Sequence, residues 1–221
     1  MRLVLARQTE RRRALSDMSQ GWFNGIPWLW DRFQISYTPD GAYVGKSLAE
    51  ISTDSGIDPD EVFLRLCEEY GNEIQVVLFY RTETDVSMFL QHPLAVVGSD
   101  GNAVPISLPY SRTHPRSFGT FPRILGRYVR DRGVLGLVDA IQKMTSEPAR
   151  RLGISDRGTV TVGSVADLVL FDARSVVDRA EFGKPAQAPE GISHVLVGGT
   201  LVLDDGEITG HRPGKVLRHH T

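Results

Sequence analysis

Two short apolar runs separated by a helical segment mark the middle of the chain. Residues 74–80 are rich in β-branched and aromatic side chains, and residues 94–98 form a second run that stops at Ser99-Asp100-Gly101. Runs of this length, bounded by turn residues, are typical of buried strands. Residues 83–91 between them predict a helix that ends before Pro93. The order strand, helix, strand favours parallel pairing in an α/β fold.

Helix and turn signals extend this pattern in both directions. A short strand is predicted over 32–37, and Asp58-Pro59 predicts a helix over 59–70, because a capping carboxylate precedes a proline at the first helical position and Gly71 follows. Further helices are expected over 121–131 and 134–144, with a short one opened by Ser146-Glu147-Pro148. Beyond them, short strands are expected over 159–162, 167–172, 194–197 and 201–203. The last third of the chain therefore predicts a small β-rich unit.

Composition narrows the class of protein. The 221 residues are 41% hydrophobic and 24% charged, with a net charge of -2, which gives no electrostatic reason to expect nucleic acid or a membrane surface as partner. Cys67 is the single cysteine, and its apolar helical spacing indicates a core thiol. No run approaches the roughly 18 apolar residues of a membrane span, and we expect a cytoplasmic protein.

Asp100 and the loop after it hold the candidate chemistry. Asp100 follows the predicted strand 94–98, and active sites of α/β folds lie at such strand ends. Arg112, His114 and Arg116 follow in the next segment. Asp-Gly is also a common turn dipeptide, so a purely structural role for Asp100 stays open on this ground alone.

Four separated motifs give the chain a recognisable likeness. They are VGSDG (97–101), THPRSFGTFPRILGRYVRD (113–131), AIQKMTSEPARRLGI (140–154) and GSVADLVLFD (163–172). In this order they resemble the D-aminoacylases, the N-acyl-D-amino-acid deacylases of the metal-dependent amidohydrolase superfamily. The likeness extends from about residue 30 to residue 218 and is dense from 98 to 172.

The resemblance implies an α/β fold, namely the C-terminal portion of a (β/α)8 barrel followed by part of a composite β-sandwich. Residues 74–80 and 94–98 would be the last two barrel strands. Residues 1–157 would form a partial barrel domain, and residues 158–221 the trailing part of the β domain.

The resemblance also implies a reaction, the hydrolysis of a linear amide in an N-acyl-D-amino acid to a D-amino acid and a carboxylate. In such enzymes zinc lowers the pKa of a bound water, and a carboxylate takes the proton and passes it to the departing amine. By resemblance Asp100 would be that general base and acid and would also contact the metal. Arg112 and Arg116 would bind the substrate carboxylate, with His114 a third contact. The simpler alternative is that these residues cap helices or pair with acidic neighbours.

The chain lacks most of the family's metal ligands. None of its six histidines forms a His-x-His pair, whereas a catalytic zinc normally has about three protein ligands. We therefore expect a truncated or partial chain with little activity alone, or one half of an enzyme whose N-terminal barrel half is a second chain. Two alternatives are kept: a non-catalytic subunit completing another chain's barrel, for which the tryptophan-rich segment 22–30 would offer a surface, and a cyclic amidohydrolase of the dihydroorotase or hydantoinase kind.

Overall fold

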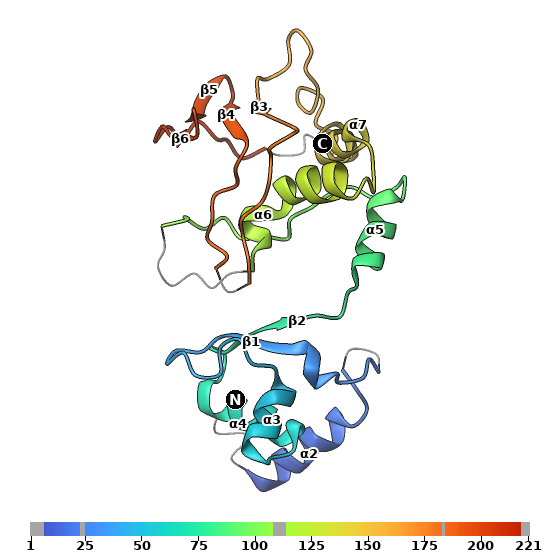
Figure 1. Ribbon diagram of the computed structural model, residues 1–221, viewed down its shortest axis with the longest axis vertical. Helices are drawn as coiled ribbons and strands as arrows, with labels where there is room; N and C mark the ends of the chain where they lie inside the picture. Colours follow the sequence, from blue (N-terminus) through green and yellow to red (C-terminus); the bar gives the residue numbers. More distant parts are fainter. Residues whose placement is uncertain (1–6, 23–24, 108–113, 183, 218–221) are drawn as a thin grey trace. The chain divides into compact units, whose positions relative to one another are not determined.

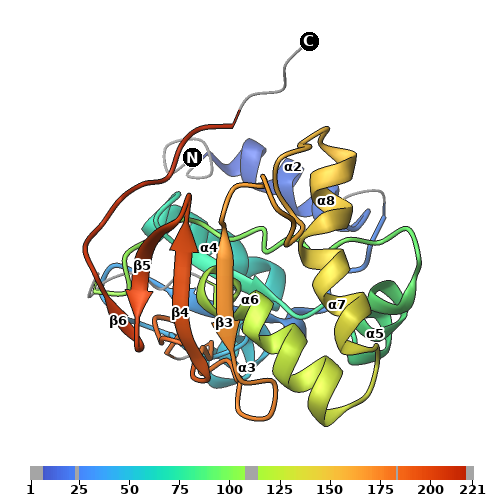
Figure 2. The same cartoon turned by 90° about the horizontal axis from the view of Figure 1, so that it is seen from above.

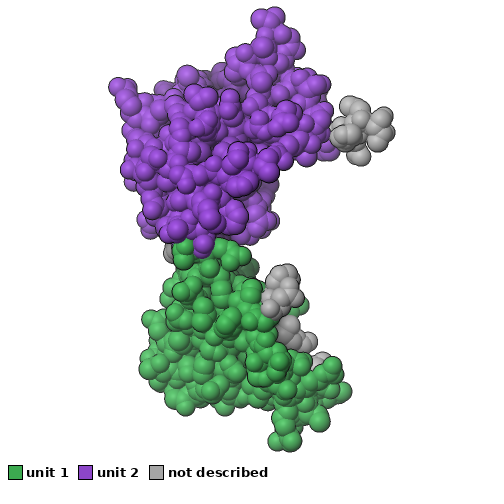
Figure 3. Space-filling model, turned by 90° about the vertical axis from the view of Figure 1, so that its right-hand side faces the viewer, with its two compact units in different colours: residues 1–82 green, residues 83–221 purple. Residues whose placement is uncertain are grey.

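The computed structural model describes residues 7–22, 25–107, 114–182 and 184–217. The chain divides into two compact units, residues 1–82 and 83–221, shown in different colours in Figure 3. Helices and sheets occur in both units, which confirms the expectation of a mixed α and β protein. No helix of the described residues is long and apolar enough to cross a membrane.

In the part of the first unit that the structure describes, a two-stranded sheet lies with three α-helices, and α2 packs on α4 (Figure 1). Its elements are α2 (Gln8–Met18), η1 (Trp30–Arg32), β1 (Phe33–Tyr37), α3 (Leu48–Ser55), α4 (Pro59–Tyr70) and β2 (Gln75–Leu78). The predicted helix 59–70 is confirmed. The Asp58 side chain accepts the Asp60 N–H at 3.0 Å, and Gly71 ends the helix at a φ of 64°.

The strand predicted over 74–80 exists but differs in environment and pairing. β2 pairs with β1 in antiparallel register, with Phe33 opposite Leu78, so the prediction of parallel pairing is wrong here. β2 is also largely exposed, whereas β1 carries the buried Phe33 and Ile35. The apolar composition of residues 74–80 predicted a buried strand. In the structure β2 pairs with β1, and it is β1 that places its side chains in the core.

The core of the first unit explains its tryptophans. Trp28 and Trp30 stack with ring centroids 4.9 Å apart, and both pack against Phe33 and Phe63. The Trp30 Nε1–H donates to Asp60 at 2.9 Å. These rings are therefore occupied within their own unit, which is the packing role expected of large aromatics.

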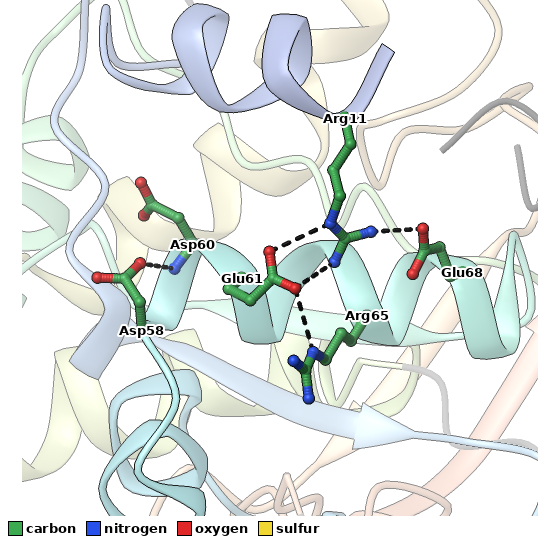
Figure 4. Close-up of polar contacts among 6 residues, drawn as sticks. All are labelled: Arg11, Asp58, Asp60, Glu61, Arg65 and Glu68. Atoms are coloured by element: carbon green, nitrogen blue, oxygen red, sulfur yellow. Dashed lines mark hydrogen bonds and ion pairs between the residues drawn. The ribbon is translucent and has the colours of Figure 1, made fainter. Parts of the chain in front are cut away.

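A charge cluster joins α2 to α4 in the same unit (Figure 4). The Arg11 guanidinium donates to Glu61 at 2.6 and 3.2 Å and pairs with Glu68, and Arg65 donates to Glu61 from the next turn at 3.1 Å. Arg11 thus joins α2 to two glutamates of α4, and Arg65 adds a hydrogen bond within α4. The Arg11 side chain, at the start of a run of three arginines, is therefore only 19% exposed.

Over its described residues, the second unit combines five helical segments with a four-stranded antiparallel sheet of order β3-β4-β5-β6. Figures 1 and 2 both show α6 and α7 on the β3 side of that sheet. Its elements are α5 (Glu83–Gln91), α6 (Arg116–Arg123), η2 (Ile124–Asp131), α7 (Leu137–Met144), α8 (Ser146–Arg151), β3 (Leu168–Phe171), β4 (Ile192–Val197), β5 (Thr200–Asp204) and β6 (Glu207–Ile208). The strands expected near 167–172, 194–197 and 201–203 are confirmed, but residues 159–162 are irregular.

The helix predicted from residue 121 begins earlier, at Arg116, and continues directly into η2. Gly119 and Thr120 are therefore helical. Pro122 lies inside this helix and has no N–H to donate to the preceding turn. The residues after it adopt π-type hydrogen bonding, which accommodates such an interruption.

The strand predicted over 94–98 is wrong: these residues are irregular. Their backbone is instead held by α7 and α8. Lys143 is almost fully buried, and its Nζ donates to the carbonyls of His92 at 2.6 Å and Ala95 at 2.9 Å. The Val97 N–H donates in return to the carbonyl of Lys143 at 3.0 Å. The apolar run therefore finds its hydrogen bonds on helices rather than on a sheet.

Candidate active site

The loop that carries Asp100 lies against the start of α6. Asp100 has a left-handed backbone with a φ of 47°, and the next residue approaches so closely that a Cβ on Gly101 would lie 2.8 Å from Ser117 Cα. The Asn102 N–H donates to Ser117 Oγ at 3.1 Å. This close approach explains the Asp-Gly dipeptide and fixes the loop at the N-terminal end of the helix.

Asp100 and Arg116 meet at this place. Arg116 Nη2 lies 2.9 Å from Asp100 Oδ2, and the Asp100 side chain is 85% exposed. The expectation of a carboxylate at the tip of a buried strand is wrong, because the preceding segment is irregular. The two residues are nevertheless brought together, and Arg116 has the acidic neighbour that the simpler interpretation anticipated.

His114 sits just before the helix. Its Nδ1 accepts the backbone N–H of Arg116 at 3.1 Å, which caps the first turn. Burial lowers the pKa of His114, and the positive charges of Arg116 and Arg123 lower it further. The Phe182 ring contacts the imidazole edge-on, with centroids 5.0 Å apart. His114 therefore favours the neutral form, in which it can donate one hydrogen bond.

A pocket of about 330 Å³ opens beside these residues. Its lining comes from the start of α6 and from the segment before β4: His114, Pro115, Arg116, Gly119, Thr120, Arg123, Ala180, Glu181 and Phe182. The expectations from sequence did not include Phe182 or Glu181. Arg123 is already engaged, since it binds the largely buried Asp178 at 2.7 and 2.9 Å. Arg116 thus links the pocket to Asp100.

Two predicted contributions are not found in the described part of the chain. Arg112 lies outside the described residues, so its proposed contact with substrate has no structural account. Among the described residues, no group of three His, Cys, Asp or Glu side chains could hold a metal ion. Asp100 is therefore a single candidate ligand, and these residues do not fit a zinc site by themselves.

The arrangement can do limited but specific chemistry. An exposed carboxylate can accept a proton from water, and an adjacent guanidinium can bind a carboxylate through two parallel hydrogen bonds. A neutral imidazole beside them offers a further polar contact. A proton acceptor and an anion-binding group therefore lie next to one another at one end of α6.

Comparison with known proteins gives this arrangement a context. The chain is 43% identical over 190 residues to an N-acyl-D-glutamate deacylase of Alcaligenes xylosoxydans xylosoxydans, covering 85% of this chain and 36% of the relative. An N-acyl-D-aspartate deacylase of the same organism is 39% identical over 175 residues, covering 78% of this chain and 33% of that protein. The chain therefore spans about a third of the length of these relatives.

Structural comparison agrees. The crystal structure of N-acyl-D-glutamate deacylase from Bordetella bronchiseptica, complexed with zinc and a phosphonate inhibitor, matches with a TM-score of 0.71 and 38% identity. The match covers 86% of this chain and 38% of that one. The model of the amidohydrolase family Amidohydro_3 matches residues 53–203. The two curated relatives described above are named as deacylases of N-acyl-D-amino acids, and the chain belongs to this amidohydrolase family.

Proposed function

We propose that this chain supplies the Asp100 end of the active site of an N-acyl-D-amino-acid deacylase, which hydrolyses a linear amide to a D-amino acid and a carboxylate. The observation that supports it most is the Asp100–Arg116 pair at 2.9 Å, in a chain whose relatives are named as deacylases of this kind. Those relatives favour a linear amide over the cyclic amides considered from sequence.

Each side chain has a role in this proposal. Asp100 takes a proton from the attacking water and gives it to the leaving amine, and its exposure leaves it accessible to both. Arg116 binds the substrate carboxylate with its planar guanidinium, exchanging Asp100 for the ligand. His114, neutral at pH 7, contacts a polar group of the substrate. Arg112 is assigned to the same carboxylate from the sequence alone.

The finer fold assignment belongs to the same proposal. Residues 1–157 correspond to the last part of a (β/α)8 barrel, and residues 158–221 to the trailing part of a composite β domain. The support is that β3 to β6 all lie after residue 158 and form one antiparallel sheet. The strand β3 lies at the edge of this sheet and exposes Val169 and Leu170. Exposed apolar residues on an edge strand are consistent with further polypeptide packing against it.

Zinc is the cofactor expected from a solved relative, which is complexed with it. Because the described residues of this chain do not assemble three ligands, we assign no catalytic step to a metal here. We propose that the ligands come from another segment of polypeptide, in a longer chain or in a partner. This chain alone is then expected to have little activity.

A chimeric enzyme, made by grafting this chain into the relative, tests the proposal, because the N-acyl-D-glutamate deacylase supplies the segment that this chain lacks. The 190 matching residues of the N-acyl-D-glutamate deacylase are replaced by those of this chain, and release of D-amino acid is measured. We expect deacylation that Asp100→Asn removes. Asp205→Asn is the matched control, because Asp205 is also exposed, precedes a glycine and has a φ of 46°. A folded, zinc-loaded graft without deacylase activity would contradict the proposal.

A further inference from the structure

The face of α6 and η2 that carries Gly119 and Gly126 holds an extended segment of the chain against the helix. These glycines are seven residues apart, which places them on one helix face. A Cβ on Gly119 would lie 3.1 Å from Asp178 Cβ, and a Cβ on Gly126 would lie 2.6 Å from the Val176 carbonyl oxygen. The segment 176–180 therefore runs closer to this helix than a larger side chain would allow.

Two arginines on the same helix hold that segment in register. Arg123 binds Asp178 at 2.7 and 2.9 Å, and Arg130 Nη1 donates to the Val176 carbonyl at 2.5 Å. Val176 and Ala180 are buried against the helix. The direction follows from the pairs: Val176 lies by Gly126 and Asp178 by Gly119, so the segment runs antiparallel to the helix, toward its N-terminal end.

The segment ends at the pocket described above. Phe182 is the next aromatic residue along it, and its ring meets His114 edge-on at 5.0 Å while remaining 44% exposed. Phe182 also lines the pocket, together with Arg116, the partner of Asp100. A rigidly anchored segment thus brings an aromatic wall to the place where the Asp100–Arg116 pair lies.

We propose that Phe182 is a specificity-determining residue that contacts the amino-acid side chain of the substrate, and that the side chain selected is apolar. This rests on the proposed function. When Arg116 holds the substrate carboxylate, the neighbouring wall of the pocket is the Phe182 ring.

The charges of the pocket select against a second carboxylate on the substrate. Arg123 is neutralised by the largely buried Asp178, and Glu181 adds a negative charge to the lining. An acidic side chain would meet Glu181 without gaining the Arg123 charge. The class of substrate favoured is therefore an N-acyl-D-amino acid with an aliphatic side chain, in contrast to the glutamate and aspartate named for the relatives.

Binding to the full chain tests this directly, with N-acetyl-D-leucine, N-acetyl-D-alanine and N-acetyl-D-glutamate titrated by two-dimensional NMR. The leucine derivative is expected to bind most tightly. Phe182→Ala is expected to lower the leucine-to-alanine affinity ratio by roughly tenfold, the usual effect of losing a contact with an apolar group. Phe182→Leu should retain most of the ratio. Phe89→Ala, which removes an exposed phenylalanine of α5 outside the pocket, should leave it unchanged.

The possible failures are distinct. If the unmodified chain binds these ligands but Phe182→Ala keeps the ratio, or if N-acetyl-D-glutamate binds most tightly, the inference is overturned and the proposed deacylase function stands. If the unmodified chain binds none of the three, the inference is overturned, and the graft assay decides on the proposed function separately. A partly exposed side chain such as Phe182 can be truncated without unfolding the unit, and the NMR spectrum itself reports whether the fold is intact.

Discussion

Arg116 Nη2 and Asp100 Oδ2 lie 2.9 Å apart, with the arginine in the first turn of α6 and the aspartate in the preceding loop. The loop is fixed to the helix by Gly101 and Asn102, so this distance does not depend on the ion pair alone. An exposed pair of this kind stabilises little, about 0–1 kcal/mol. The ion pair therefore contributes little to folding, and the proposed role of the two groups can be tested by substitutions that leave the fold intact.

Asp100→Asn should accordingly separate function from stability. In the graft described above, we expect deacylation to fall by roughly 10²–10⁴-fold, the usual contribution of a general acid–base group. The free energy of unfolding of the original chain should change by less than about 1 kcal/mol, because the ion pair is exposed. Enzyme kinetics and urea unfolding measure the two effects. A loss of folding stability large enough to account for the loss of deacylation would assign Asp100 a structural role.

Arg116→Gln should raise the pKa of His114. The shift should be partial, because burial is the larger cause of the lowered pKa and remains in the variant. The pKa of His114 in the folded chain lies below its unfolded value of about 6.5. The unfolded state therefore binds a proton first as the pH falls. The stability that comes from the neutral imidazole is present above pH 6.5 and is lost as the pH falls toward the folded pKa. NMR titration of the imidazole C–H resonances measures the change. An unchanged pKa would mean that Arg116 does not act on His114.

Local sequence signals predicted several elements well. Asp58, Pro59 and Gly71 set the ends of α4, because caps and backbone preferences act within one turn. The helix 83–91 was likewise expected with the bounds of α5. In the tail, turn-bounded apolar runs located β3, β4 and β5. Where the deciding interaction is local, the sequence was sufficient.

Non-local partners decided the features that were predicted wrongly or missed. Residues 94–98 have strand composition, but Lys143 and its carbonyl take up their hydrogen bonds. The sequence carries one signal for the close packing of segment 176–180 on α6. It is the pair Gly119 and Gly126, seven residues apart, with arginines between and after them. Nothing local in the sequence places Phe182 beside His114, because the two residues are distant in the chain.

Lys143→Met should destabilise the second unit by about 1–3 kcal/mol. The substitution keeps an apolar stem but leaves the carbonyls of His92 and Ala95 without their charged donor, and such groups are costly to leave unpaired. Urea unfolding gives the free energy. Amide hydrogen exchange at Val97 should quicken, because its hydrogen bond to the backbone carbonyl of residue 143 opens more often once the lysine Nζ no longer holds the preceding segment. Lys184→Met, at an exposed position, is the control and should stay within about 0.5 kcal/mol.

Gly126→Ala should also destabilise this unit, by about 1–3 kcal/mol, since the added Cβ would lie 2.6 Å from the Val176 carbonyl oxygen and would push segment 176–180 away from the helix. Gly98→Ala is the matched control, because a Cβ there has no atom of the described residues within 4 Å. Thermal unfolding compares the two variants. Equal stability of both would show that the close approach at Gly126 relaxes without cost.

The first unit should lose stability in acid through Glu61. A hydrogen bond from Arg11 lowers the pKa of Glu61, and one from Arg65 adds to it. A carboxylate with a lowered folded pKa contributes stability that is present above its unfolded pKa of about 4.3 and is lost as the pH falls through the folded value. Arg11→Met should flatten this part of the pH dependence, since its main cause is removed. Arg12→Met, on the same helix and with no Glu61 contact among the described interactions, should leave the profile unchanged. Urea midpoints between pH 3 and pH 6 measure the profiles, and identical slopes for both variants would contradict the role of the α2–α4 cluster.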